Sequence, residues 1–317
     1  MEKLLRWYNQ NRKAFWFRII TIILVGSIIW RIFYIFNSGR KKNAYINKNQ
    51  INNEELNSIS LGSMQSVINK KNTTINKEDI YLIDSFFSYC NSQNVQEAYK
   101  LVSDECKEIM FNDIKLFNNI YVAPLFKNGK RSIKIENWNG SIYRVELDED
   151  YLSTGKISKE NTSVDYISTV KDSNGNIKLN INSYIGRTNL DKIVSTNGVD
   201  IKLTKKDSYM DYEIYTFEVK NNTEKSIILG NIQNEEKVSY LIDKNNYKYN
   251  AYVHELAQSQ LEVFGKQTKN VSIKYFNEYG STKVIESIVF PEIYLNYEEY
   301  KKYPNSYRAF TSISIDL

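Results

Sequence analysis

The chain has 317 residues, of which 42% are hydrophobic and 25% charged, which is typical of a folded protein with room for two ordinary domains. Its 42 basic and 37 acidic residues leave a net charge of only +5, which argues against nucleic acid as a partner. Two cysteines and one histidine argue against a zinc or iron–sulfur site, so we predict no metal and no cofactor.

An apolar stretch near the N-terminus, Ala14–Phe36, predicts a single transmembrane helix. From Phe15 to Phe36 such a helix would rise roughly 33 Å, which is enough to cross a hydrocarbon core. Arg18 and Arg31 lie near its two ends, from which their side chains can reach the lipid headgroups. Because no small-residue cleavage site follows, we expect a retained helix rather than a cleaved signal peptide.

Basic residues flank this stretch on both sides, so the positive-inside rule barely separates the two flanks. A short basic tail followed by one helix is typical of a signal anchor. Residues 1–13 are therefore predicted to be a cytoplasmic tail, and the C-terminal part to lie outside the cell membrane. Residues 37–76, rich in Asn, Ser and Lys, are predicted to be a flexible linker.

The hydrophobic pattern then changes from a helical period to a strand period. Between Glu78 and Phe126, apolar residues recur at spacings of three and four, which predicts three helices. From Arg131 onward, apolar and polar residues alternate, and Asn139–Gly140 and Asn174–Gly175 mark two tight turns. The pattern predicts three helices followed by about four antiparallel strands.

This order of elements resembles the nuclear-transport-factor-2-like superfamily, whose fold is a cone of curved sheet wrapped on helices. The stretch Glu97–Phe111, EAYKLVSDECKEIMF, is similar to bacterial extracytoplasmic members. The resemblance implies a cone-like α+β domain over residues 77–187. Ketosteroid-isomerase-like members use a carboxylate base in an apolar cavity, opposite a Tyr or a protonated acid. Residues of those types are so common in this chain that their presence selects nothing, and we expect structural roles for Asp84, Tyr89, Tyr143 and Asp165.

Residues 188–317 read as seven or eight short strands separated by regular turns, which predicts a β-sandwich. Three stretches, Glu218–Thr223, Leu241–Asp243 and Ile288–Phe290, resemble immunoglobulin-like domains of bacterial envelope proteins, although the Cys–Trp–Cys framework of antibody domains is missing. The predicted fold class is therefore α+β, with an N-terminal transmembrane helix, a cone-like α+β domain and an all-β immunoglobulin-like sandwich.

Two features involve the residues with the most reactive side chains. His254, beside Glu255, is the only imidazole available to a catalytic dyad or triad, and without a nucleophile in view we expect a surface histidine. Cys90 and Cys106 lie on the first and third predicted helices. They could pair in an oxidising envelope, or both could be small apolar core residues.

Two further clusters have a binding and a structural interpretation. The acidic run Glu146–Asp150 could ligate Ca²⁺, but it lacks the spacing of a calcium loop, so a solvated loop is favoured. The tyrosine-rich segment Tyr294–Tyr307 could form a contact surface or a cover on the sandwich, and the structural role is favoured.

Together these patterns predict no catalytic, cofactor-binding or metal site. They favour a non-enzymatic, membrane-anchored binding or scaffold protein of a Gram-positive-like cell envelope, with its C-terminal domains outside the membrane. Its partners would be other envelope proteins, for example in a secretion or conjugation assembly. Membrane-anchored subunits of type IV secretion channels share the single helix and cone-like domain, which is an analogy of fold only.

Two alternatives remain open, a small-ligand sensor that uses the cone cavity and an enzyme of the isomerase or hydratase kind. A deep pocket that holds a carboxylate with a raised pKa would favour the enzyme, and a deep pocket without one would favour the sensor. A filled cone with an exposed apolar patch would favour the scaffold.

Overall fold

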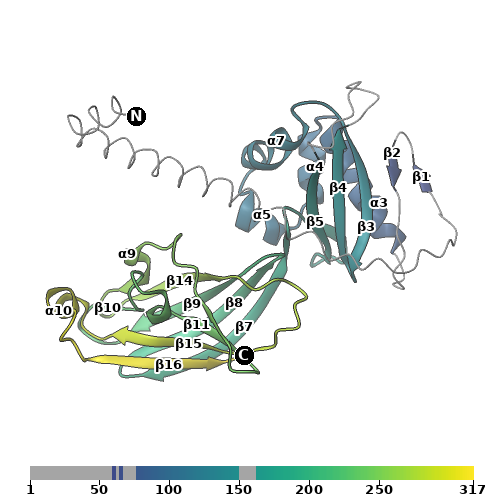
Figure 1. Ribbon diagram of the computed structural model, residues 1–317. Coiled ribbons are helices and arrows are strands. Elements are labelled where there is room, and N and C mark those ends of the chain that lie inside the picture. The colour runs from purple at the N-terminus through teal and green to yellow at the C-terminus, as the bar shows by residue number, and fades with distance from the viewer. Residues whose placement is uncertain (1–58, 62–63, 67–75, 150–161) are drawn as a thin grey trace, which may run out of the picture. The chain divides into compact units, whose positions relative to one another are not determined.

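The computed structural model describes residues 59–61, 64–66, 76–149 and 162–317 (Figure 1). The predicted cytoplasmic tail 1–13, the predicted transmembrane helix 14–36 and most of the predicted linker 37–76 lie outside these ranges. The described residues all fall within one compact unit that spans residues 56–317.

The predicted fold class is wrong for the described part of the chain. None of the helices in the described ranges combines the length and the apolar character that a membrane span requires. The longest of them, α3 (Lys77–Asn91), has 15 residues and carries charged side chains at Lys77, Glu78, Asp79 and Asp84. At about 1.5 Å per residue it is too short for a hydrocarbon core. Strand, at about 44%, outweighs helix, at about 24%, so the structure is α+β with strand predominating.

Short helices follow α3, several of them begun by side-chain caps. Ser103 caps α5 by accepting the N–H of Cys106 at 3.1 Å, and Asp113 caps α6 by accepting the N–H of Leu116 at 2.7 Å. The second cap divides a stretch in which the sequence predicts one continuous helix. The elements are α4 (Val95–Leu101), α5 (Asp104–Met110), α6 (Ile114–Phe117), a π-helical turn η2 (Asn118–Val122) and α7 (Ala123–Phe126).

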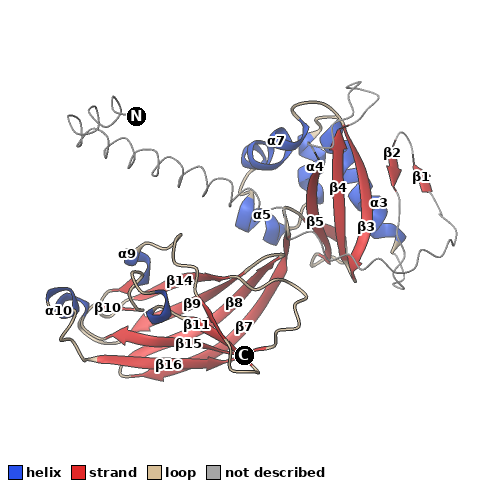
Figure 2. Ribbon diagram, in the orientation of Figure 1, coloured by secondary structure: helices blue, strands red, loops and turns tan. Residues whose placement is uncertain are grey.

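The helices accompany a four-stranded antiparallel sheet in the order β3-β4-β5-β6 (Figure 2). Its strands are β3 (Arg131–Asn139), β4 (Ile142–Glu149), β5 (Ser163–Lys171) and β6 (Ile177–Asn180). The predicted turns are confirmed, because Gly140 and Gly175 join paired strands and both have positive φ. Alternate residues of β3 and β4 face a core shared with the helices, among them Ile133, Ile135, Val145 and Leu147.

The C-terminal part consists of two further sheets around a second core. One sheet has the order β14-β9-β8-β7. Its strands are β7 (Tyr184–Thr196), β8 (Val199–Tyr209), β9 (Glu213–Asn221) and β14 (Thr268–Tyr275). The other has the order β12-β11-β15-β10-β13, with β16 paired to β15. Its strands are β10 (Ile227–Ile228), β11 (Tyr240–Asp243), β12 (Lys248–Asn250), β13 (Glu262–Val263), β15 (Ile285–Tyr294) and β16 (Phe310–Asp316).

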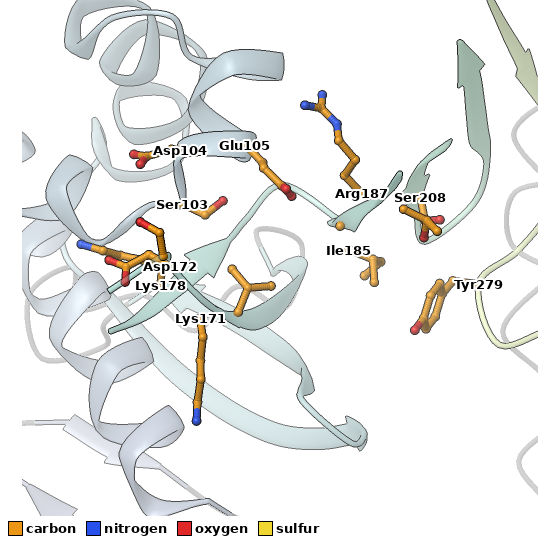
Figure 3. A pocket seen from close by; sticks show the side chains of 14 residues that line it. Ser103, Asp104, Glu105, Lys171, Asp172, Lys178, Ile185, Arg187, Ser208 and Tyr279 are labelled. Atoms are coloured by element: carbon orange, nitrogen blue, oxygen red, sulfur yellow. The ribbon is translucent and has the colours of Figure 1, made fainter. Parts of the chain in front are cut away.

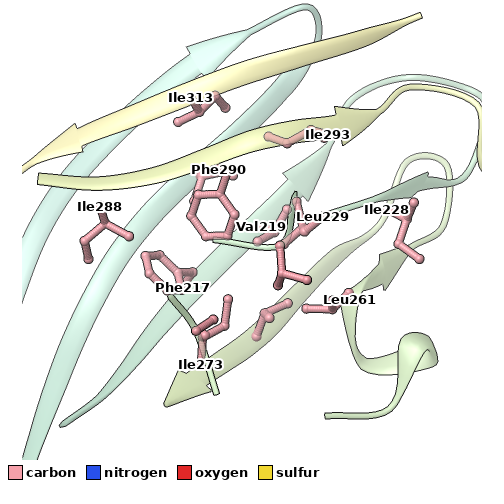
Figure 4. Packing of buried hydrophobic residues seen from close by; sticks show 14 of the residues in the cluster. Phe217, Val219, Ile228, Leu229, Leu261, Ile273, Ile288, Phe290, Ile293 and Ile313 are labelled. Carbon is pink, nitrogen blue, oxygen red and sulfur yellow. The ribbon is translucent and has the colours of Figure 1, made fainter. Parts of the chain in front are cut away.

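Side chains from both sheets interlock in this second core (Figure 4). Phe217 of β9 and Phe290 of β15 meet edge to face at 5.1 Å between ring centroids, and both are fully buried. Three short helical elements connect strands of the C-terminal part. They are η4 (Glu235–Lys237), α9 (Gln258–Leu261) and α10 (Tyr297–Lys302).

Within the predicted linker, β1 (Ile59–Leu61) pairs antiparallel with β2 (Met64–Ser66).

Strand β7 joins the helical part to the two C-terminal sheets without a break. Its first residue, Tyr184, belongs to the helical core, while Val194 packs against the second core. The predicted domain boundary at 187/188 falls inside this strand. Around the junction, the N–H of Met210 donates to the carbonyl of Ser183 at 3.0 Å, and the N–H of Tyr279 donates to the carbonyl of Met210 at 2.8 Å.

Candidate binding cleft beside strand β7

Aromatic side chains fill the core between the helices and the sheet β3-β4-β5-β6. Phe117 and Tyr121 stack at 5.9 Å between ring centroids, and Phe86 lies 5.9 Å from Tyr121. Phe87 and Phe111 are also fully buried in the same cluster. These rings pack against one another inside the core of the helical part.

Asp165, whose carboxylate the sequence analysis considered as a possible catalytic base, links three other residues by hydrogen bonds inside this core. It accepts the hydroxyl of Tyr121 at 2.6 Å and the backbone N–H groups of Asn182 and Ser183 at 3.0 and 2.8 Å. Burial raises the pKa of Asp165, and these hydrogen bonds oppose that rise. Both turn residues have positive φ, so the carboxylate fixes the strained turn between β6 and β7.

The sequence does not reveal the partner Tyr121. The only local signal is that Asp165 occupies an inward position of β5, where the alternation of the strand calls for an apolar residue.

Tyr143 also has a structural partner. Its hydroxyl donates to Asp79 at 2.8 Å, and Thr169 donates to the same carboxylate oxygen at 3.0 Å. Asp84 and Tyr89, the other two residues named from the sequence, take no part in this group. Burial raises the pKa of Asp84, and Tyr89 packs at the edge of the helical core. The four residues therefore do not converge on one site.

His254 lies at the surface, whereas the two cysteines are buried. The side chain of His254 is 71% exposed, and its Nε2 lies 3.6 Å from Glu235, while Glu255 pairs with Lys274 at 3.2 Å. A surface histidine is what the sequence predicts. Cys90 and Cys106 are unpaired thiols buried in the helical core, and burial raises the pKa of Cys106 to about 12.

The acidic run has partners on its own sheet. Glu146 pairs with Arg144 at 2.6 Å and with Lys134 at 3.5 Å, and Asp148 accepts the hydroxyl of Thr162 at 2.5 Å. Asp150 lies outside the described residues. In the part of the chain that the structure describes, no three His, Cys, Asp or Glu side chains are grouped so that they could hold a metal ion.

The tyrosine-rich segment covers the end of the second core. Tyr294 stacks on Tyr300 with ring centroids 3.9 Å apart, and Tyr307 is buried beside them. The structural interpretation of Tyr294–Tyr307 is therefore supported.

A cleft of about 590 Å³ opens beside the first residues of β7 (Figure 3). Ser103 and Glu105 lie on its helical side, Tyr279 lies on the opposite side, and Ile185 lies between them. The lining residues come from α5 and its N-cap, from β5, β6, β7 and β8, and from two loops. They are Ser103, Asp104, Glu105, Val170, Lys171, Asp172, Ser173, Lys178, Ile185, Gly186, Arg187, Thr188, Ser208 and Tyr279. Three are acidic and three are basic, so neither charge dominates the cleft.

The floor of the cleft is held by hydrogen bonds to one carbonyl. The carbonyl of Ile185 accepts Nδ2 of Asn180 at 2.9 Å and the hydroxyl of Ser168 at 2.5 Å. Asn180 in turn bonds through its side chain to the hydroxyl of Ser103, the residue that caps α5. Ile185 lies in a bulge of β7, between the residues that pair with Tyr209 and Ser208. The cleft is therefore preformed.

Arg187 lies in one wall of the cleft. Its guanidinium is not available to a ligand because it is already paired with two carboxylates. Its Nε donates to Asp207 at 2.8 Å and its Nη1 donates to Glu108 at 3.1 Å, with only 9% of the side chain exposed. The Arg187 guanidinium also holds the pKa of Glu108 below its ordinary value. The side chains of Glu105 and Lys171, by contrast, make no hydrogen bond or ion pair with other described residues, so they can respond to a bound molecule.

A second pocket, of about 340 Å³, continues along the same strand and shares Thr188 and Tyr279 with the cleft. Leu190 of β7 lines it, together with Glu213. Glu213 is itself satisfied by Lys206 at 2.9 Å, Tyr215 at 2.9 Å and Asn277 at 3.0 Å. Among the described strands, only β8 pairs with β7, which makes β7 an edge strand of its sheet.

Comparison with known proteins gives no relative. No family model, curated protein or solved structure matches this chain. The likeness to nuclear-transport-factor-2-like and immunoglobulin-like domains therefore stays a prediction from the sequence pattern.

Proposed function

We propose that this protein is a non-enzymatic binding protein that holds an extended segment of a partner protein in the cleft beside β7. The observation that carries the proposal is the position of the cleft and the second pocket, which follow one another along a single edge strand. Extended peptides are commonly recognised in this way, with backbone contacts to the strand and side chains in flanking pockets.

The composition of the cleft supports a peptide over a small charged metabolite. Apolar Ile185 and Tyr279 line the cleft together with Glu105 and Lys171, whose side chains carry opposite charges and make no hydrogen bond or ion pair with other described residues. A peptide offers apolar, cationic and anionic groups within a few residues, whereas a strongly charged ligand would favour a cleft of one sign.

The buried carboxylates argue against an enzyme. Asp165 and Asp79 each satisfy hydroxyl or backbone donors of the chain itself, inside a packed core. A general base must reach the proton that it removes from a substrate, and neither carboxylate lines the cleft.

The N-terminal sequence supports two predictions. The protein lies at the cell envelope, and its partners are other envelope proteins. Protease treatment of intact cells tests the location, because residues beyond 80 are digested if they lie outside. Their survival, with digestion only after lysis, would contradict it.

The cleft itself is tested by site-specific photocross-linking in cells. A photoreactive residue at Thr188, which lines both pockets, is expected to give a discrete heavier adduct. The matched control is Phe264, which is 55% exposed and lines neither pocket. Glu105→Lys should reduce the Thr188 adduct, because it reverses an unpaired charge at the cleft. No adduct from Thr188, together with a small molecule that co-purifies with the intact protein, would reject the proposal in favour of a ligand sensor.

A further inference from the structure

Ser208 of β8 lines the cleft, and its hydroxyl has no hydrogen-bond partner among the described residues (Figure 3). The residue is only 6% exposed. Its hydroxyl is nevertheless not sealed inside the protein, since Tyr307 carries the only fully enclosed side-chain nitrogen or oxygen without a partner in the described ranges. The hydroxyl of Ser208 therefore opens into the cleft.

An unused hydroxyl at a buried position calls for an explanation. Buried hydroxyl groups are usually hydrogen-bonded, because an unpaired one loses its contacts with water and gains nothing in exchange. Two other buried serines at the cleft follow this rule, since Ser103 caps α5 and Ser168 donates to the carbonyl of Ile185. Ser208 does not follow it, which is expected where a bound molecule supplies the missing partner.

The two residues opposite Ser208 in the sheet leave its hydroxyl accessible and add no unpaired charge. On β7 it faces Gly186, which has no side chain to cover the hydroxyl. On β9 it faces Glu213, whose carboxylate is paired with Lys206 at 2.9 Å. A charged ligand group would lose water here without meeting an unpaired opposite charge, which is unfavourable. An uncharged polar group is the better fit.

We propose that Ser208 is a specificity-determining residue, whose hydroxyl hydrogen-bonds an amide group of the segment held in the cleft. This inference rests on the proposed function and names the chemical group that the site recognises. A serine hydroxyl can donate one hydrogen bond and accept two, and an amide offers both an acceptor and a donor without a charge. The amide belongs either to the backbone of the segment or to an Asn or Gln side chain.

A structural role and a binding role of Ser208 predict different effects of Ser208→Ala on stability. A hydroxyl that held the fold together would lower the midpoint of urea unfolding when it is removed. Because this hydroxyl has no partner among the described residues, the midpoint should stay unchanged or rise. Ser168→Ala is the matched contrast, since it removes a donor to the carbonyl of Ile185 and should lower the midpoint.

The binding experiment uses random twelve-residue peptides displayed on phage, selected on the full chain purified in a mild detergent. Peptides that bind Glu105→Lys more weakly than the unsubstituted chain are kept as ligands of the cleft, and their Kd is measured by fluorescence anisotropy. Ser208→Ala should raise this Kd roughly tenfold. The matched control Ser314→Ala, at an exposed position of β16 that lines neither pocket, should leave it unchanged.

Two changes to a selected peptide identify the source of the amide. N-methylation of single peptide bonds should weaken binding at one position if the backbone supplies it, and replacement of an Asn or Gln side chain by Leu should do so if a side chain supplies it. Either loss should be absent when the same peptides are measured on Ser208→Ala, because the hydroxyl is then missing.

Three results would overturn the inference and leave the proposed function in place. They are a lower urea midpoint for Ser208→Ala, an unchanged Kd for that variant, and a loss on peptide modification that is the same with and without the hydroxyl. A selection that yields no ligand of the cleft would instead reject the proposed function, and the inference with it.

Discussion

Replacing Asp165 by Ala is expected to destabilise the helical part strongly, because the carboxylate has three donors in a packed core. The hydroxyl of Tyr121 and the N–H groups of Asn182 and Ser183 would all lose their acceptor. A buried donor left without a partner costs about 1–3 kcal/mol. The two N–H groups lie on a half-buried turn and can recover part of this by contact with water, so we expect a total loss of about 3–5 kcal/mol.

The assay is urea unfolding of the full chain, followed by far-ultraviolet circular dichroism, with the free energy of unfolding extrapolated to water. Tyr121→Phe is the matched control, because it removes one of the three hydrogen bonds and keeps the ring stacked on Phe117. That variant should lose about 1–2 kcal/mol. The reasoning is refuted if Asp165→Ala loses less than Tyr121→Phe, since the carboxylate would then not be the centre of the network.

Three further substitutions test other parts of the structure by the same unfolding measurement. Glu108→Gln should be less stable than the unsubstituted chain above about pH 4.5 and equal to it in stronger acid. The reason is that Arg187 lowers the folded-state pKa of Glu108 below 4.5, and the stability this gives is lost as the pH falls through the lower value. The pair is exposed on the Glu108 side, so the difference should stay below about 1 kcal/mol, and a difference that does not shrink as the pH falls below 4.5 would contradict this account. Gly265→Ala should destabilise by about 1–3 kcal/mol, because a Cβ there would meet a backbone carbonyl oxygen at 2.3 Å; unchanged stability would show that this loop is loosely packed. Phe290→Ala should cost about 3–5 kcal/mol through the cavity it leaves, whereas exposed Phe264→Ala should change stability by less than about 0.5 kcal/mol, and equal losses would contradict the assignment of the second core.

The sequence predicts those elements whose signal is local. The strands from Arg131 to Asn180 follow from period-two alternation, and their turns follow from Asn–Gly pairs that tolerate positive φ. Helix lengths are less well predicted, because Asp113 begins a new helix inside an apolar run that looks continuous. The transmembrane element of the predicted fold class has no counterpart in the described ranges.

The cleft could not be predicted because its residues meet only through long-range pairing. Ile185 and Tyr279 are far apart in the sequence and come together where β7, β8 and a later loop converge. The stretch 186–191 lacks alternation and looks like a connector, yet it is strand because β8 pairs with it. Tertiary pairing here overrides the local pattern.

Strand β7 contributes side chains to both cores, so no flexible linker separates the two cores. Cutting the gene at codon 187, as the sequence pattern suggests, would break the ladder between β7 and β8 and strip the helical core of Tyr209, which lies on β8. The N-terminal fragment should therefore not be stable when it is expressed alone. Because the two cores share this strand, residues 76–149 and 162–317 should unfold as a single cooperative event.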